Sequence, residues 1–152
     1  MHHPETAINV SKINRISTQT LFAAWLVALA STLGALFIGE IMGKMPCILC
    51  WYQRIGMFPL AVLLGIGLFR EEAQVKYYAL PFSLAGLGIA VFHNLLYFGI
   101  LPESIRPCAQ NGPSCTSMDM TILGGLPIPL LSAVAFTLIT ILLFITRRKH
   151  TP

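Results

Sequence analysis

The chain has 152 residues, of which 55% are hydrophobic and 11% are charged, and its net charge is +4. Soluble domains carry roughly 25% charged residues, so this composition excludes an ordinary soluble domain and indicates a membrane protein. The basic residues form no stripe with interleaved aromatic side chains, so we expect no nucleic-acid partner.

Four segments are apolar over lengths that cross a bilayer, which takes roughly 20 helical residues. In lipid, only helices and closed barrels form all the hydrogen bonds that the backbone requires. The strict alternation of apolar and polar residues that a barrel requires is absent, so helices are expected. We therefore expect an all-α membrane protein, a bundle of four transmembrane helices embedded in the lipid bilayer. The expected helices cover about 19–42, 47–69, 77–100 and 122–146.

Two tails flank this transmembrane domain, which we place at residues 19–147. Residues 1–18 are polar and are expected to form a poorly ordered tail, and residues 148–152 form a basic tail. Two basic residues ahead of an apolar run also resemble the start of a cleavable signal peptide. The run continues to Gly39, which is too long for the usual hydrophobic region of such a peptide, so an uncleaved anchor is favoured.

Basic residues are distributed unequally between the two sides of the expected bundle. One side has only Lys44 and Arg106. The other side has seven, which are Lys12, Arg15, Arg70, Lys76, Arg147, Arg148 and Lys149. The positive-inside rule makes the richer side cytoplasmic, so both termini are expected in the cytoplasm and the two cysteine-bearing loops outside.

The first cysteine pair, Cys47 and Cys50, lies at the start of the second helix in 46-PCILCWYQR-54. Such a pair closes a very small loop, so as a structural disulfide it would remove little chain entropy. Pro46 suits the first turn of a helix, which places Cys47 at the positive end of the helix dipole with Lys44 nearby. Both effects favour the thiolate that attacks in thiol–disulfide exchange, so a redox-active pair is expected.

The second pair, Cys108 and Cys115, lies in the other outward loop in 107-PCAQNGPSC-115. Disulfides persist outside the cytoplasm, so two disulfides are the first expectation for the four cysteines. The turn-forming Asn-Gly-Pro suits closure of a small ring, and a purely structural disulfide is one alternative here. A zinc site made of all four cysteines is another, with an unusual spacing in the second pair.

Two ionisable residues lie within the expected spans. Arg54 follows Cys50 by four residues and Cys47 by seven, so the three share one face of a helix. His93, in the third helix, is expected at about the same depth as Arg54. Such residues usually mark a function, although snorkelling of Arg54 and a simple hydrogen bond of His93 are alternatives, and Asn94 suits an interhelical bond.

A lipid-soluble electron acceptor fits a pocket between these groups. The sequence contains no haem-ligand pair, flavin fingerprint or iron–sulfur spacing that would carry electrons from a dithiol. A quinone reaches such a site through lipid and needs no nucleotide-binding domain. We therefore expect a quinone whose carbonyl oxygens accept hydrogen bonds from Arg54 and His93.

The chain resembles the DsbB/BdbC family of membrane disulfide-forming oxidoreductases from the first helix to the fourth. The resemblance rests on CILC at residues 47–50 followed by WYQR at 51–54, on the second cysteine pair and on 127-PIPLLSAVAF-136. His93 also matches a family position. The short separation within the second pair is closer to the BdbC branch, and Tyr97 stands where family members often have glutamine.

This resemblance implies a relay in the bacterial cytoplasmic (inner) membrane, with a multi-pass protein whose active site is extracytoplasmic. A soluble or anchored thioredoxin-fold thiol oxidase, similar to DsbA or BdbD, would pass electrons to the disulfide Cys108–Cys115. The disulfide Cys47–Cys50 would reoxidise that pair. Cys50 would face the quinone, a ubiquinone or menaquinone. Arg54 would hold the quinone, and His93 would lie near it.

Two other functions stay open at this point. A vitamin K epoxide reductase-like quinone reductase is also a helical bundle with a Cys-x-x-Cys, but there the loop pair comes first in sequence and here it comes second. A non-catalytic membrane protein with two structural disulfides is the alternative from another class. Structural bridges resist mild reductant, whereas catalytic bridges cycle with a reduced partner and a quinone.

Overall fold

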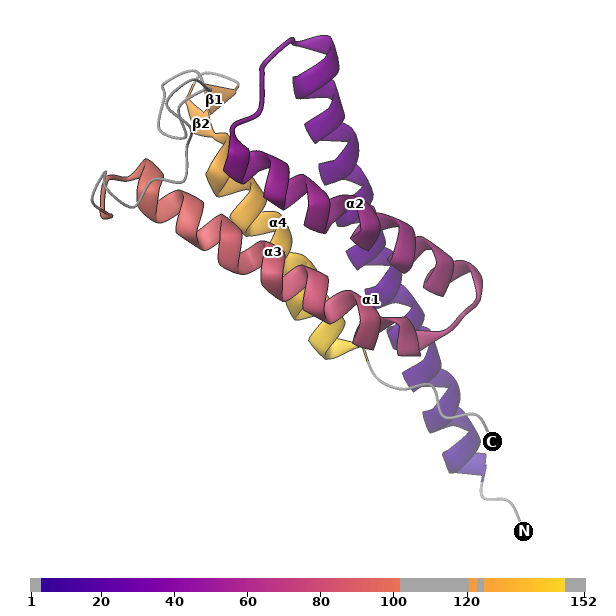
Figure 1. The fold of residues 1–152 in the computed structure, drawn as a ribbon. Coiled ribbons are helices and arrows are strands. Elements are labelled where there is room, and N and C mark those ends of the chain that lie inside the picture. Colours follow the sequence, from indigo (N-terminus) through magenta and orange to yellow (C-terminus); the bar gives the residue numbers. More distant parts are fainter. Residues whose placement is uncertain (1–3, 102–120, 123–124, 147–152) are drawn as a thin grey trace.

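Four long helices make up most of the described chain, which covers residues 4–101, 121–122 and 125–146 of a computed structural model (Figure 1). The helices are α1 (Pro4–Leu36), α2 (Ile48–Phe69), α3 (Lys76–Tyr97) and α4 (Ile128–Ile145). Each contributes one stretch that is long and apolar enough to cross a membrane, and these stretches are Asn14–Ile41, Ile48–Phe69, Lys76–Tyr97 and Ile128–Ile145. The predicted all-α membrane bundle is confirmed.

Four short elements connect the helices. A π-helical turn, η1 (Phe37–Ile41), continues α1, and a 3₁₀ turn, η2 (Ala73–Val75), leads into α3. The strands β1 (Thr121–Ile122) and β2 (Leu126–Pro127) pair antiparallel just before α4. They are too short to change the fold class.

The start of α1 differs from the prediction. The helix begins at Pro4, well before the expected start near residue 19, and it extends past the other helices in Figure 1. Proline is well accommodated in the first turn of a helix. The backbone groups of the polar residues after it form intrahelical hydrogen bonds, as those of apolar residues do. The predicted start of the first helix near residue 19 is therefore corrected, because hydropathy marks the membrane-spanning part of a helix and not its end. The predicted poor order of residues 1–18 stays a prediction.

The start of α4 also differs from the prediction. The expected helix over 122–146 begins only at Ile128, after the β1–β2 hairpin. Gly125 has a φ of 136°, which a glycine adopts readily and other residues rarely do. Pro127 is the N-cap of α4 with extended backbone, and Pro129 suits the first turn. These residues turn the chain before the helix can begin.

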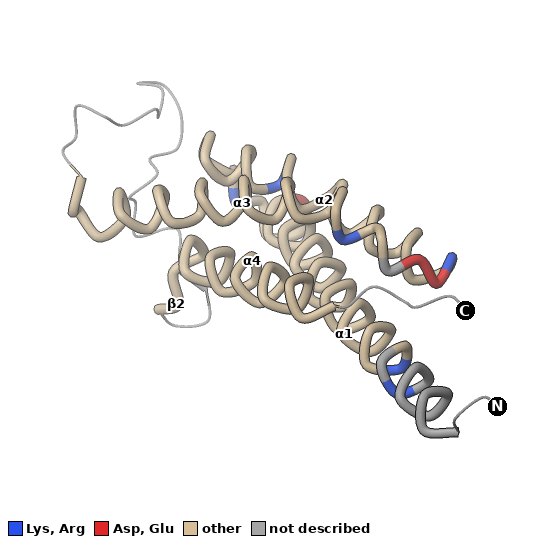
Figure 2. Tube along the Cα trace, turned by 90° about the horizontal axis from the view of Figure 1, so that it is seen from below, with Lys and Arg blue, Asp and Glu red and all other residues tan. Residues whose placement is uncertain are grey.

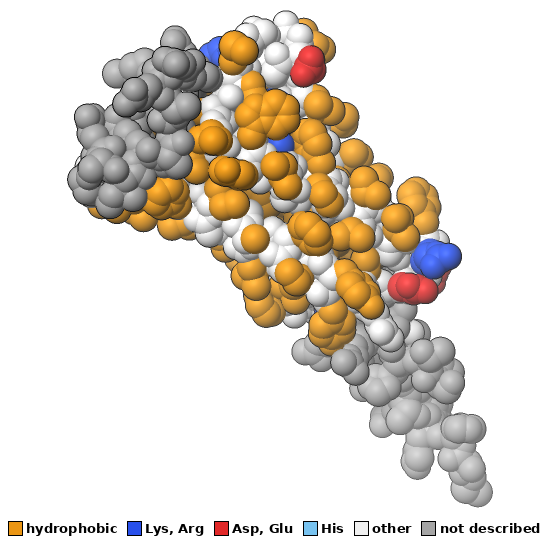
Figure 3. Space-filling view, viewed as in Figure 1, with side chains coloured by type: hydrophobic (Ala, Val, Ile, Leu, Met, Phe, Trp, Pro, Cys, Tyr) orange, Lys and Arg blue, Asp and Glu red, His pale blue; other side chains and the backbone are white. Residues whose placement is uncertain are grey.

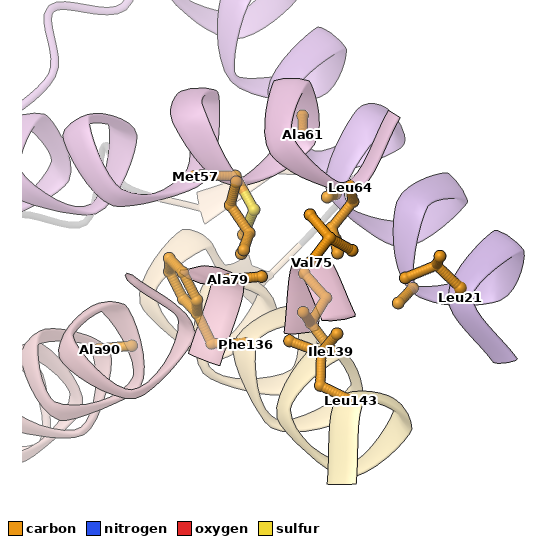
Figure 4. Close-up of a cluster of buried hydrophobic side chains, with 13 residues drawn as sticks. Leu21, Met57, Ala61, Leu64, Val75, Ala79, Ala90, Phe136, Ile139 and Leu143 are labelled. Carbon is orange, nitrogen blue, oxygen red and sulfur yellow. The ribbon is translucent and has the colours of Figure 1, made fainter. Parts of the chain in front are cut away.

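The helices pack as a bundle in which α1 and α3 each contact both α2 and α4. A buried apolar cluster fills the centre, with Leu60 and Leu64 from α2 and Phe136, Ile139 and Leu143 from α4. Figure 4 shows this cluster converging from several helices. Large apolar side chains on the outside are exposed and cover the face shown in Figure 3, which suits contact with lipid.

Small and hydroxyl residues bring the helices close together. Ala24 and Ala28 of α1 and Ala79 of α3 are fully buried. The hydroxyl groups of Ser83 and Thr140 lie 2.6 Å apart and join α3 to α4. Lipid is as apolar as the interior, so close packing and interhelical hydrogen bonds hold a membrane bundle together.

Gly86 provides a test of the α3–α4 packing. A Cβ at Gly86 would clash with the ring of Phe136, whereas a Cβ at Gly88 would meet nothing within 4 Å. Overpacking a buried contact costs about 1–3 kcal/mol, and alanine gains up to about 1 kcal/mol over glycine in a helix. We expect Gly86→Ala to lower the thermal midpoint in detergent and Gly88→Ala to leave it unchanged or raise it. Equal midpoints for the two variants would contradict this packing.

Candidate active site

A cavity of about 720 Å³ lies between α1, α2 and α4. Its size is typical of sites for small organic molecules. The polar part of its wall comes mainly from α2 and the residues before it, with Cys47, Cys50, Gln53 and Arg54. Most other lining residues are apolar, and they include Ala30, Ala35, Ile38, Leu131, Ala135 and Phe136.

Cys47 and Cys50 lie side by side at the start of α2. Their Sγ atoms are 3.3 Å apart as two thiols, and the Cys47 Sγ accepts a hydrogen bond from the Cys50 backbone N–H at 3.4 Å. Cys47 is the N-cap of the helix, so Pro46 lies just outside the helix and not in its first turn as expected. The proposed redox pair is thus brought together, and its disulfide stays a prediction.

His93 lies against Cys47 from α3. Its side chain is fully buried, with Nε2 3.8 Å from the Cys47 Sγ and Nδ1 3.3 Å from the Gln53 Nε2. When the Gln53 amide donates to Nδ1, the ring proton is on Nε2, and this nitrogen faces the sulfur. Gln53, on the turn after Cys50, therefore orients the imidazole toward Cys47.

These contacts lower the pKa of Cys47 to about 4. The largest cause is the hydrogen bond that the Cys50 thiol donates to the Cys47 sulfur, and His93 and the Cys50 backbone N–H act in the same direction. Burial opposes them, because it disfavours a charged sulfur. Cys47 is therefore the thiolate of the reduced pair near neutral pH, and a thiolate is the nucleophile of disulfide exchange.

A pH titration of thiolate absorbance tests this arrangement. In reduced protein with Cys108→Ala and Cys115→Ala, we expect one thiolate to persist from neutral pH down to about pH 4 and to be lost as the pH falls through that value. An ordinary cysteine loses its thiolate below about pH 8.5. Cys47→Ser should remove the acidic transition. A transition only in the ordinary range would show that the contacts of Cys47 do not stabilise its thiolate.

Arg54 lies in the cavity wall one turn beyond Cys50. Its Nη2 donates a hydrogen bond of 2.7 Å to the backbone oxygen of Ala35 in α1, and its guanidinium lies 5.5 Å from the centre of the Trp51 ring. A Cβ at Gly39 would come within 2.9 Å of Nη2, so this glycine leaves the space that the guanidinium occupies. π-helical turns such as η1 occur frequently at functional sites.

Arg54 and His93 lie differently with respect to the cavity. Arg54 lines the cavity, but His93 is not among the lining residues and contacts the cysteine pair from α3 instead. His93 thus lies behind the cysteine pair rather than in the cavity wall, and its predicted contact with a quinone stays a prediction. Tyr97 likewise packs in the small cluster around Cys47 and Leu96, outside the cavity wall.

The sequence pattern predicted no role for Gln53, which lies within WYQR at residues 51–54. A polar residue on the helix turn after a cysteine pair inside a membrane span was the available signal. Asn94 was expected to make an interhelical bond, and its Nδ2 donates to the backbone oxygen of Pro129 in α4 at 2.8 Å. That prediction is confirmed.

The second cysteine pair, Cys108 and Cys115, lies outside the described residues, as does Arg106. The segment that holds them ends next to β1. Lys44, which lines the cavity, donates to the backbone oxygen of Thr121 in β1 at 3.0 Å. This bond ties the loop before α2 to the strand that follows the cysteine-bearing segment.

A four-helix membrane bundle with a pair of thiols in the wall of an apolar cavity has the features of a membrane thiol oxidoreductase. The sequence model of the family described as "Disulfide bond formation protein DsbB" matches residues 17–146, and the chain belongs to this family. The match spans all four helices of the bundle. No solved structure matches the chain significantly.

Three relatives show how far the likeness extends. A "Probable disulfide formation protein" of Metapseudomonas resinovorans is 52% identical over 132 residues, which cover 87% of this chain and 92% of that protein. A protein of the same description from Deinococcus radiodurans is 46% identical over 140 residues, 86% and 90% of the two chains. "Disulfide bond formation protein C" of Bacillus subtilis is 41% identical over 121 residues, 80% and 87% of the two chains.

Membership of this family establishes the general function of the chain. The chain is a multi-pass membrane oxidoreductase with a role in disulfide bond formation. The predicted relation to the DsbB/BdbC family is confirmed, and the vitamin K epoxide reductase-like alternative is set aside.

Proposed function

We propose that this protein is a thiol:quinone oxidoreductase that reoxidises an extracytoplasmic thioredoxin-fold thiol oxidase and passes the electrons to a membrane quinone. The observation that carries the proposal is the common wall of one apolar cavity, in which Cys47, Cys50 and Arg54 lie together. Oxidation of the two thiols to a disulfide releases two electrons and two protons. A quinone takes up both and becomes a quinol, so the reaction balances.

The residues of the cavity fit a quinone. The wall is mostly apolar, as a ring and its isoprenoid chain require, and it offers few polar groups. Arg54 provides planar N–H donors suited to a carbonyl oxygen, and Gln53 provides an amide. Ubiquinone and menaquinone both match this description. Arg54 would hold the quinone beside Cys50, and His93 would act on the cysteine pair from α3.

The roles of the pair follow from their positions. Cys47 is almost fully buried, at the N-cap, and its sulfur faces both Cys50 and His93. In turnover, a thiolate of the reduced second pair attacks the Cys47 sulfur of the Cys47–Cys50 disulfide, and Cys50 leaves as a thiolate on the side of the quinone. The other thiol of the second pair then attacks this mixed disulfide, which closes Cys108–Cys115 and releases Cys47 as a thiolate.

The second pair is the proposed contact with the partner. In the forward direction, the dithiol of the thioredoxin-fold protein reduces the disulfide Cys108–Cys115, and this pair in turn reduces the disulfide Cys47–Cys50. Each exchange breaks one disulfide and forms another, and two thiol protons move with each step. The Lys44–Thr121 bond supports this order, because Thr121 follows the cysteine-bearing segment in sequence and Lys44 lines the cavity.

The proposed location is the bacterial cytoplasmic (inner) membrane, with both termini inside and the cysteine pairs outside. In the described chain, the turn between α2 and α3 and the early part of α1 both carry charged residues (Figure 2). Reporter fusions after Arg70 and Arg148 should report the cytoplasm, and fusions near Lys44 and Gln110 should report the outside. Labelling of an engineered cysteine at Lys76 by an impermeant reagent added outside would contradict this orientation.

A coupled assay tests the proposed function. The purified protein in detergent is mixed with a reduced thioredoxin-fold thiol oxidase and a soluble quinone, and quinone absorbance and partner thiols are followed together. We expect one quinone to be reduced for each partner disulfide formed. Absence of turnover with DsbA-like and BdbD-like partners and with both quinone types would contradict the proposal.

A further inference from the structure

Three ligand atoms converge at the start of α2. The Sγ atoms of Cys47 and Cys50 and a ring nitrogen of His93 all lie within 4.8 Å of one another. Cys47 and His93 are buried, and Cys50 is partly exposed. The ligands come from two helices, which fixes their relative positions through the packing of α3 against α2.

The spacing of these atoms is close to that of a tetrahedral zinc site. Bonds of about 2.3 Å to sulfur and about 2.0–2.1 Å to nitrogen place two sulfurs about 3.8 Å apart and a sulfur and a nitrogen about 3.6 Å apart. In this protein the two sulfurs are 3.3 Å apart, and the Cys47 Sγ and His93 Nε2 are 3.8 Å apart. The Cys50 Sγ and the His93 ring nitrogen lie within 4.8 Å, so metal binding requires rotation of these side chains toward one another.

The chemistry of the ligands selects the metal. Thiolate and imidazole favour zinc and similar borderline or soft cations over magnesium or calcium, which require oxygen ligands. Two thiolates neutralise a divalent cation, so the bound site adds no net charge beside Arg54. Gln53 already contacts His93 Nδ1, and with its amide turned its oxygen accepts the Nδ1–H when Nε2 binds the metal.

We propose that the reduced pair, together with His93, forms a Cys₂His binding site for zinc, with the fourth position open toward the cavity. Binding displaces the remaining thiol proton, on Cys50, and leaves both sulfurs metal-bound, so neither is free to reduce a quinone and re-form the disulfide. Since a disulfide cannot supply two thiolates, zinc binds only the reduced enzyme and holds it in that state. This inference deepens the proposed function, because it makes the redox pair a point of inhibition by metal.

Cobalt(II) and zinc(II) are the probes. The full-length protein carries Cys108→Ala and Cys115→Ala, so the second pair contributes no ligand, and it is reduced in detergent under anaerobic conditions. We expect one cobalt per chain, with the intense visible bands of tetrahedral coordination, and displacement by zinc. X-ray absorption of the zinc form should show two sulfurs and one imidazole. A shell without imidazole, or with fewer than two sulfurs, would overturn the site.

Two comparisons complete the test. His93→Asn should weaken zinc binding at least about tenfold relative to Ser83→Ala, which changes another buried polar residue of α3. Oxidation of the pair should abolish binding. Equal affinity in His93→Asn and Ser83→Ala, or in the oxidised and reduced protein, would overturn the proposal. If His93→Asn does not fold, the X-ray absorption result decides. None of these readouts involves quinone or a protein partner, so failure here is distinct from failure of the proposed function.

Discussion

Replacement of Cys50 with serine is expected to lower quinone reduction by a factor on the order of a thousand or more. A hydroxyl cannot form the disulfide through which two electrons leave the pair, so the relay stops at Cys47. Serine is close in size to cysteine, and the bundle should keep its thermal midpoint. The coupled assay with a reduced partner and a soluble quinone measures the loss.

The control for this variant is Thr137→Ala. Thr137 is exposed on α4, and its hydroxyl donates to the backbone oxygen of Ala133 within the same helix. Its replacement should leave turnover unchanged. Turnover of Cys50→Ser at the rate of this control would show that electrons bypass the Cys47–Cys50 pair.

Replacement of Arg54 with methionine is expected to raise the KM for quinone about 10- to 100-fold. Hydrogen bonds from charged donors contribute about 1.5–3 kcal/mol, and methionine keeps the apolar stem while removing the planar donors. Arg70→Met is the matched control, because Arg70 follows the other end of α2. An unchanged KM in Arg54→Met would remove Arg54 from the quinone site.

Gly39→Ala tests the same position without changing the arginine. The added Cβ would lie 2.9 Å from Arg54 Nη2 and 3.1 Å from Nη1, so the guanidinium must move. We expect the KM for quinone to shift in the same direction as in Arg54→Met, but less. Gly88→Ala, where the added Cβ meets nothing within 4 Å, should have no effect. A KM for Gly39→Ala equal to that of Gly88→Ala would show that the guanidinium position does not matter.

The sequence predicted the membrane spans well because hydropathy records which residues must face lipid or the interior. It also placed Cys47, Cys50 and Arg54 on one face of α2, and all three line one cavity. That prediction needed only the helical repeat. The starts of α1 and α4 were placed wrongly, because a helix can continue beyond the membrane and because Gly125 and Pro127 turn the chain inside an apolar segment.

The position of His93 could not be obtained in the same way. Depth in the membrane follows from counting residues, but the direction of a side chain depends on how its helix is rotated against its neighbours. Packing of α3 against α2 turns His93 toward Cys47 and Gln53, which line the cavity while His93 itself does not. The contact between Gln53 and His93 joins two helices, and nothing in either segment alone indicates it.

One measurement tests the central claim, that the Cys47–Cys50 pair delivers electrons to a quinone in the cavity. Protein with Cys108→Ala and Cys115→Ala is reduced, freed of reductant and mixed with a soluble quinone without oxygen or any partner. We predict one quinone reduced per chain, with a Cys47–Cys50 disulfide identified by mass spectrometry. The contradicting result is a bound quinone that stays oxidised while both cysteines remain thiols.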